Sequence, residues 1–230
     1  AAAHAGDDPE EEGGAIRLTR ATIEEAAQKK ALLYDKKGEE HYNIISALHK
    51  SLRGGDPDAS LYWLARMLEA GEDPLYVARR LVRFASEDVG NADPQALSIA
   101  LAAMQACHFI GLPEGKLALA QCAVYLALAP KSNALYTAYD EAARDAAEYG
   151  PLPVPRDIRN PVTRFMKDIG YGKDYRYPHE DPDAVVDQEY FPDELRGRGY
   201  YRPVERGFER EMRKRLEYWR SLREKKKGSR

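Results

Sequence analysis

The sequence is poor in cysteine: Cys107 and Cys122 are the two cysteines among 230 residues, and neither belongs to a C-x-x-C pair. A disulfide framework or a cysteine-based zinc site needs more sulfur atoms at closer spacing, so both are excluded. Because both residues lie within apolar helical patterns, we expect two reduced thiols in the core.

Long hydrophobic runs are missing as well. No segment approaches the roughly 18 consecutive apolar residues that a membrane-spanning helix needs, and the first residues lack the charged and then apolar order of a secretory signal. We therefore expect an intracellular protein with no membrane partner.

The common catalytic and nucleotide-binding motifs are also absent. A P-loop needs G-x-x-x-x-G-K-[ST], and the nearest approach, residues 111–117, has its glycines one position too close and leucine in place of the hydroxyl residue. No H-E-x-x-H and no G-x-S-x-G occurs. His179, Glu180 and Asp181 resemble a ligand set, but their polar, proline-flanked surroundings favour a solvated loop. We expect no catalytic residue, metal or cofactor in this chain, and no ATP hydrolysis by it.

What the chain does contain is 43% hydrophobic residues, enough for a substantial core. Between residues 38 and 150 apolar residues recur at intervals of three and four, which predicts helices. Three Asp-Pro pairs predict helix starts at residues 56, 73 and 93, because aspartate caps free backbone N–H groups and proline fits the first turn. The expected helices cover residues 22–33, 38–54, 56–70, 74–89, 94–110, 113–129 and 132–149. We predict an all-α fold and favour a compact helical bundle over a HEAT-like solenoid, because no sequence repeat has a fixed period.

After residue 150 the composition changes. Residues 151–155 read P-L-P-V-P, which is incompatible with a helix, and residues 170–206 are rich in tyrosine, proline and charge. Such a segment has too little apolar content for its own core, so we expect an arm that either lies across the bundle through its tyrosines or stays mobile. A short helix is expected at residues 160–168, and a longer one at about 205–225.

Net charge is unevenly distributed. The formal total is -3, but residues 1–12 carry -5, residues 206–230 carry +7 and residues 13–205 carry -5. A chain of this kind cannot hold nucleic acid by bulk attraction, so any DNA contact has to come from local clusters. The basic C-terminal helix is the best electrostatic candidate, although a solvated helix face has the same composition.

Arginines at positions 79, 80 and 83 occupy one helical flank and could contact phosphates. Glu87 and Asp88 lie one turn further on, however, so an intramolecular ion-pair face is the favoured interpretation.

Two other features have both a binding interpretation and a structural one. Lys131 and Ser132 precede a helix whose free N–H groups could hold an anion, but helix capping by the hydroxyl is favoured. Tyr171, Tyr175 and Tyr177 alternate with cations and could stack on single-stranded bases, but tyrosines that fasten the arm to its own domain are favoured.

Several ordered segments together carry a family resemblance. They are YDKKGEEHYNIISALHKSLRG (34–54), DPDASLYWLARML (56–68), GEDPLYVARRLVRFASEDVG (71–90), IGLPE (110–114), APKSN (129–133) and MKDIGYGK (166–173). In this respect the chain, over about residues 34–220, resembles the C-terminal region of the replication-associated recombination protein A family, AAA+ ATPases that include the Werner helicase-interacting protein.

The resemblance implies a domain order. Residues 1–33 would be a linker and the end of an AAA+ lid, residues 34–150 a helical oligomerisation domain similar to the clamp-loader collar, residues 151–205 an extended arm, and residues 206–230 a basic helix. The full-length parent would be a DNA-dependent ATPase that binds ATP and Mg and acts in replication-fork maintenance, recombination and repair. It would reside in the bacterial cytoplasm or nucleoid or, alternatively, in a nucleus.

The implied partners are further copies of the chain in a homotetramer, DNA at single-strand/double-strand junctions, and a single-strand-binding protein, polymerase or helicase. The expected self-association residues lie on the helices at 56–70 and 74–89, namely Tyr62, Trp63, Arg66, Met67 and Tyr76. The expected DNA-binding residues are Lys50, Arg53, Arg79, Arg80, Arg83 and Lys131. The alternative is a protein-protein adaptor platform that docks replication proteins and never contacts DNA.

Overall fold

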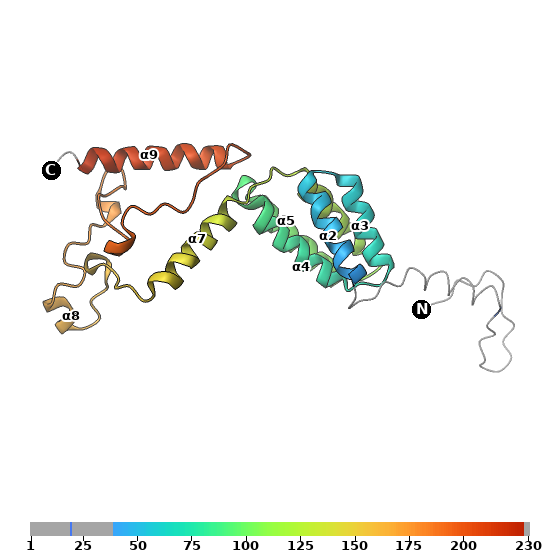
Figure 1. Ribbon diagram of the computed structural model, residues 1–230, viewed down its shortest axis with the longest axis horizontal. Coiled ribbons are helices and arrows are strands. Elements are labelled where there is room, and N and C mark those ends of the chain that lie inside the picture. The colour runs from blue at the N-terminus through green and yellow to red at the C-terminus, as the bar shows by residue number, and fades with distance from the viewer. Residues whose placement is uncertain (1–18, 20–38, 228–230) are drawn as a thin grey trace. The chain divides into compact units, whose positions relative to one another are not determined.

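The computed structural model describes Thr19 and residues 39–227, and every regular element within them is helical (Figure 1). The α-helices are α2 (Glu39–Gly54), α3 (Pro57–Glu69), α4 (Pro74–Phe84), α5 (Gln95–Ile110), α6 (Lys116–Leu128), α7 (Ala134–Tyr149), α8 (Arg164–Asp168) and α9 (Glu209–Lys227). The predicted all-α class is therefore confirmed. The helix expected at residues 22–33 lies outside the described residues.

Short elements complete the chain. A π-helical turn, η1 (Ala85–Val89), and a 3-10 turn, η2 (Gly90–Ala92), follow α4 directly. Three further 3-10 turns interrupt the segment between α7 and α9, namely η3 (Arg156–Ile158), η4 (Pro178–Glu180) and η5 (Asp193–Leu195). Apart from α8, these 3-10 turns and a few other turns, the segment is irregular, as expected from its prolines.

The three predicted Asp-Pro helix starts are confirmed by the bonds that the aspartates make. Asp56 Oδ1 accepts a hydrogen bond of 2.9 Å from the Ala59 backbone N–H at the start of α3. Asp73 Oδ1 and Asp93 Oδ1 each accept one of 3.0 Å, from the N–H groups two residues further on. These carboxylates satisfy backbone donors that a helix leaves without intrahelical partners.

The contacts divide the chain into two compact units, each described by itself. Among the described residues, unit 1 contains residues 39–80 and 103–128, and unit 2 contains residues 81–102 and 129–227, so that α4 and α5 contribute to both. Within unit 2, α7 groups with the arm and α9.

Unit 1 has a closely packed apolar interior. Helix α2 packs against α3 and α6, and α3 packs against α6. Leu48, Leu52, Met67, Leu119 and Leu126 are each 0% exposed. Burying one such side chain stabilises the fold by about 1.5–3 kcal/mol relative to leaving it in water.

The two cysteines lie in the same unit, and both are free and buried, as expected. Burial raises the pKa of the Cys122 thiol to about 12. A thiol with that pKa contains almost no reactive thiolate at neutral pH.

Unit 2 joins α7 and α9 to the π and 3-10 turns. Helix α7 contacts η1 and η2, and α9 contacts η2. The Phe208 backbone N–H donates a hydrogen bond of 2.7 Å to the Ala92 carbonyl oxygen. A Cβ at Gly207, whose φ is +52°, would lie 2.0 Å from that same oxygen, so the close approach requires glycine.

The arm is fastened within unit 2 rather than by its tyrosines alone. Arg198 Nε lies 3.0 Å from Asp145 Oδ2 on α7, and Arg202 donates a hydrogen bond of 2.9 Å to Glu141 Oε1 on the same helix. The Tyr200 hydroxyl donates one of 2.8 Å to Asp145. The arm therefore pairs its cations with the carboxylates of α7.

Helix α5 turns its larger apolar side chains outward. Its buried side consists of Ala96, Ala100, Ala103 and Cys107. Leu97 and Leu101 are among the exposed hydrophobic residues. The helix carries no Asp, Glu, Lys or Arg on either side. Its exposed side also carries Ser98, Gln105 and His108, so polar and large apolar side chains share that side.

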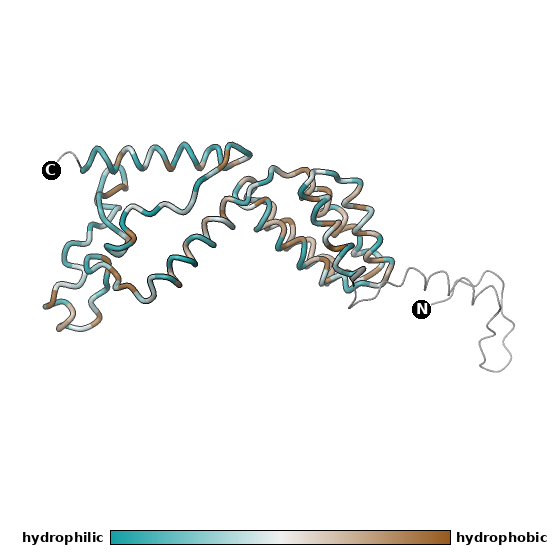
Figure 2. Tube along the Cα trace, viewed as in Figure 1, coloured by the Kyte–Doolittle hydropathy of each residue, from teal (hydrophilic) through white to brown (hydrophobic). Residues whose placement is uncertain are grey.

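None of the helices described within residues 39–227 is both long and apolar enough to cross a membrane. Hydropathy nevertheless differs between helices, since α9 is almost uniformly hydrophilic whereas the helices of unit 1 are rich in hydrophobic residues (Figure 2).

Candidate functional site

The predicted arginines of α4 are engaged in contacts within the chain. Arg83 Nε lies 2.6 Å from Glu87 Oε2, which confirms the predicted ion pair with Glu87. The Arg79 guanidinium lies 5.6 Å from the centre of the Tyr76 ring. Arg80 is half-buried. These contacts agree with the intramolecular interpretation, and Arg79 and Arg83 remain exposed to solvent.

The side chains of Lys131 and Ser132 form hydrogen bonds with nearby backbone groups. Lys131 Nζ donates a hydrogen bond of 2.6 Å to the Ala129 carbonyl oxygen, and burial lowers the pKa of Lys131 although nearby Asp88 opposes the shift. Ser132 Oγ accepts a hydrogen bond of 3.2 Å from the Ala134 N–H, which confirms the capping interpretation.

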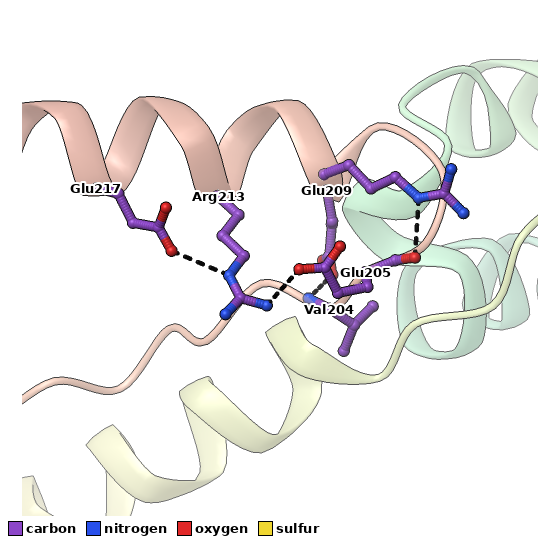
Figure 3. Close-up of polar contacts among 6 residues, drawn as sticks. Val204, Glu205, Glu209, Arg213 and Glu217 are labelled. Atoms are coloured by element: carbon purple, nitrogen blue, oxygen red, sulfur yellow. Dashed lines mark hydrogen bonds and ion pairs between the residues drawn. The ribbon is translucent and has the colours of Figure 1, made fainter.

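A carboxylate of the same chain, that of Glu209, lies beside the start of α7. Glu209, which is 0% exposed, accepts hydrogen bonds from Ser132 Oγ at 2.9 Å and from the Tyr201 hydroxyl at 2.9 Å. The Val204 backbone N–H donates a third, of 2.8 Å, to Glu209 Oε2 (Figure 3). One buried carboxylate thus joins the start of α7, the arm and α9. Sequence reasoning missed it, because its partner Ser132 lies 77 residues away.

The remaining predicted cations, Lys50 and Arg53, are exposed and lie three residues apart on α2, so they share a helix face. They belong to unit 1, whereas Arg83 and Lys131 belong to unit 2.

The predicted self-association residues divide into two groups. Tyr62 is 58% exposed and packs edge-on against Trp63, with ring centres 5.0 Å apart, and the Arg66 guanidinium lies 5.5 Å from the centre of the Trp63 ring. We call these three residues the α3 aromatic face.

Met67 requires a correction: it is fully buried, because the inner side of α3 runs through Ser60, Leu64, Met67 and Leu68. Tyr76 is also committed within the chain, since its hydroxyl lies 3.0 Å from His41 Nε2.

The turn between α5 and α6 exposes four large apolar side chains, which sequence reasoning did not identify. Phe109 is 91% and Leu117 77% exposed, and Ile110 and Leu112 are exposed beside them. We call these four residues the α5–α6 corner. Turns are normally polar, so the apolar residues around I-G-L-P were a signal available in the sequence.

The geometry of the turn holds these side chains outward. The Gly115 N–H donates a hydrogen bond of 2.7 Å to the Gly111 carbonyl oxygen, and a Cβ at Gly115 would lie 2.6 Å from that oxygen. Gly111 has a φ of +79°, which glycine adopts without strain.

The tyrosines of the arm also divide. Arg159 Nη1 donates a hydrogen bond of 3.0 Å to the Tyr171 hydroxyl, and its guanidinium lies 4.9 Å from that ring, so Tyr171 fastens the arm to itself as favoured. Tyr175 and Tyr177 are exposed.

The suspected ligand set His179, Glu180 and Asp181 is not assembled as a metal centre. Lys226 Nζ bonds to Asp181, and this hydrogen bond lowers the pKa of the Asp181 carboxyl. Across residue 19 and residues 39–227, no group of three or more His, Cys, Asp or Glu side chains is arranged to hold a metal ion.

A polar hollow of about 810 Å³ lies within the arm and the end of α9. Its walls place the carboxylates of Asp157, Asp174, Asp187 and Glu189 among the cations of Arg176, Arg196 and Lys227. This mixture of both charges shows no preference for a particular ligand.

Two family models match the chain. The model described as AAA C-terminal domain matches residues 2–53, and the model described as MgsA AAA+ ATPase C terminal matches residues 54–220. The second match covers the α3 aromatic face, the α5–α6 corner, the arm and most of α9.

Curated proteins give the same result. The chain is 50% identical over 218 residues to a replication-associated recombination protein A of Coxiella burnetii, which covers 94% of this chain and 50% of that protein. It is 51% identical over 188 residues to the protein of that name in Escherichia coli, covering 81% of this chain and 42% of that protein. It is 47% identical over 187 residues to ATPase WRNIP1 of Dictyostelium discoideum, covering 81% and 21% respectively.

The chain thus spans about half, or less, of the length of these relatives. The resemblance seen in the sequence is confirmed: the chain belongs to the MgsA AAA+ ATPase C-terminal family.

Proposed function

We propose that this chain is the self-assembling C-terminal region of an AAA+ ATPase acting in replication-fork maintenance, recombination and repair, and that four copies assemble through it. The observation that carries the proposal is the α5–α6 corner. Four large apolar side chains around one turn, two of them more than three-quarters exposed, form a patch that water solvates poorly. Burial against another copy removes that cost.

The arrangement of exposed residues in unit 1 supports a tetramer rather than a dimer. A closed tetramer with two-fold symmetry throughout needs two different self-complementary patches. Unit 1 carries two candidates, the α5–α6 corner and the α3 aromatic face. Tyrosine, tryptophan and arginine are the residue types enriched at protein interfaces.

Size-exclusion chromatography with light scattering tests this assembly. The unchanged chain is expected to have four times the chain mass at micromolar concentration. Replacing Phe109 and Leu117 by glutamate places charge within the corner, and replacing Tyr62 and Trp63 by alanine removes the α3 aromatic face. Each double variant should leave dimers, and the combination should leave monomers.

Leu128→Glu is the matched control. This leucine is 65% exposed at the far end of α6, outside both patches, so the variant should retain the mass of the unchanged chain. A monomeric unchanged chain contradicts the proposal, as does a loss of assembly in the control comparable to that in the corner variant.

The remainder of the proposed function concerns the longer protein. We infer that it binds ATP and Mg in an ATPase module outside these 230 residues, since they contain no P-loop. Its DNA partner would be a single-strand/double-strand junction, with Lys50, Arg53 and the other predicted cations as candidate contacts. A single-strand-binding protein, polymerase or helicase would be its protein partner, in the bacterial cytoplasm or nucleoid or in a nucleus.

An adaptor platform without DNA contact is the competing function. It predicts that the assembled chain binds no labelled forked oligonucleotide at low or high salt. Direct phosphate contact instead gives an affinity that falls steeply with salt concentration.

A further inference from the structure

One side of α9 alternates exposed rings and guanidinium groups. Phe208, Arg215, Trp219 and Arg223 follow one another at intervals of seven, four and four residues, which places them along one side of the helix. We call these four residues the α9 stripe. The Arg215 guanidinium lies 5.5 Å from the centre of the Phe208 ring, which shows that the two groups share a side. Trp219 is 51% exposed.

The carboxylates of α9 leave this stripe positively charged. Glu211 is bound by Lys214 at 2.8 Å, and Glu217 by Arg213 at 3.1 Å. Figure 3 shows Arg213 held between Glu217 and Glu205. The buried Glu209 accepts its bonds from neutral groups of the chain.

Glu224, the fourth carboxylate of α9, lies away from the stripe. It is five residues after Trp219, which places it about 140° around the helix from the indole. Arg215 and Arg223 have no ion pair with any carboxylate of the described residues, and both side chains are exposed. The bond from Lys214 and the nearby charge of Arg215, one turn further along α9, both lower the pKa of the Glu211 carboxyl. Because both guanidinium groups of the stripe are exposed, they remain accessible to an external anion.

We propose that the α9 stripe binds single-stranded nucleic acid, with phosphates on Arg215 and Arg223 and a base stacked on Trp219. Arg215 and Arg223 are eight residues apart, a rise of about 12 Å along the helix, with the indole midway between them. That order of cation, ring and cation matches a strand whose phosphates and bases are both accessible. A duplex keeps its bases stacked inside and offers none to Trp219.

This inference deepens the DNA-contact part of the proposed function and rests on it. It places the contact on α9, the best electrostatic candidate in the sequence, rather than on the predicted cations of α2 and α4. Self-assembly through the α5–α6 corner does not depend on it.

Fluorescence anisotropy with a labelled single-stranded oligothymidine of about 20 nucleotides tests the proposal at about 50 and about 200 mM salt. Trp219→Ala should weaken binding about tenfold, because one base loses its stacking partner. Tyr218→Ala is the matched control, since Tyr218 is 58% exposed on the same helix but lies about 100° away from Trp219. Its affinity should be unchanged.

The phosphate contacts have a control of equal charge. Changing Arg215 or Arg223 to glutamine, one at a time, should weaken binding and flatten the salt dependence by about one ion contact. Changing Arg213 to glutamine also removes one charge, but this cation is already neutralised by Glu205 and Glu217, so the variant should do neither. Trp63 and Trp219 are the chain's two tryptophans. Tryptophan fluorescence that oligothymidine quenches in the unchanged chain, and no longer quenches in Trp219→Ala, reports the stacking directly.

Each other outcome overturns the inference in a distinguishable way. Equal losses in the Trp219 and Tyr218 variants, or equal affinity for a duplex of the same length, exclude the stacking site. Binding lost only on charge reversal of Lys50 and Arg53 assigns the contact to α2 and leaves the proposed function standing. Binding of the same residues to anionic lipid vesicles without any to oligothymidine makes α9 a membrane-surface element. No binding of the unchanged chain to single-stranded, forked or duplex oligonucleotides rejects the DNA contact as well, while the light-scattering mass still decides self-assembly.

Discussion

The two units of this chain are stabilised by different kinds of interaction. Unit 1 is held by aliphatic side chains such as Leu48, Leu119 and Leu126, all completely buried. Unit 2 is linked across long sequence distances by carboxylates, above all Glu209, Asp145 and Glu141. Apolar burial depends little on pH or salt, whereas ion pairs and buried carboxylates depend on protonation. Unit 1 also contains the buried contact between His41 Nδ1 and Glu72 Oε2, at 2.8 Å, but its interior is mainly apolar. The structure therefore predicts that unit 2 is more sensitive to pH than unit 1.

The largest expected effect on the free energy of unfolding concerns the apolar core of unit 1. Leu119→Ala in unit 1 should lower the free energy of unfolding by about 2–5 kcal/mol, because it removes a buried side chain and leaves a cavity. Urea titration measures the loss. Leu128→Ala on the same helix, where the side chain is exposed, should change it by less than about 0.5 kcal/mol.

Glu209→Ala should destabilise unit 2 by about 2–4 kcal/mol, because the hydroxyls of Ser132 and Tyr201 and the Val204 N–H lose their acceptor. Hydrogen exchange of the Val204 amide is the local readout, and it should accelerate. Glu211→Ala, which removes an exposed carboxylate in the first turn of the same helix, serves as the control. Comparable acceleration in both variants would disprove the special role of Glu209.

Alkaline pH should affect unit 2 through Tyr201. Burial, and then its contact with Glu209, raise the pKa of this phenol above its ordinary value of 10.0, although a hydrogen bond with Asn91 lowers it. The folded state thus holds the proton more tightly than the unfolded state, so the stabilisation is complete below about pH 10 and is lost as the pH rises through the folded pKa. Denaturant titrations above pH 10 should show this loss, and Tyr201→Phe should abolish that part of the pH dependence.

Acidic pH should produce the smallest effect, at the arm. The hydrogen bond from Arg202 lowers the pKa of Glu141 below its ordinary value of 4.5, so this carboxylate contributes stability above that pH and loses it as the pH falls through the folded pKa. Hydrogen exchange corrected for the intrinsic rate should therefore increase in α7 and residues 196–205 before it increases in α2, α3 and α6. Arg202→Gln should remove this difference in part, and an equal response of both units would argue against the comparison.

Local chemistry determined which features could be predicted from the sequence. The Asp-Pro starts were predictable because the carboxylate and the ring act within three residues. The orientation of α5 was missed, although Ser98, Gln105 and His108, at intervals of seven and three residues, mark its solvent side. Met67 was predicted to take part in self-association, but it lies on the inner side of α3 next to the buried Leu68.

Long-range polar contacts were the other part that the sequence could not provide. Nothing near Glu209 in the sequence distinguishes it from the other three glutamates of α9, and its burial follows from Ser132, 77 residues away. The pairing of Arg83 with Glu87 was predictable because four residues separate the two partners on adjacent helical turns.

The hydrogen bond from the Phe208 N–H to the Ala92 carbonyl oxygen can be followed by NMR spectroscopy. This hydrogen bond is short, and the residue before Phe208, Gly207, has to be glycine for the two segments to come so close. The NMR signal of the Phe208 amide therefore reports whether α9 is in contact with η2. One isotope-labelled sample could therefore follow the docking of the whole terminal helix through one peak, during titration with acid, denaturant or an oligonucleotide.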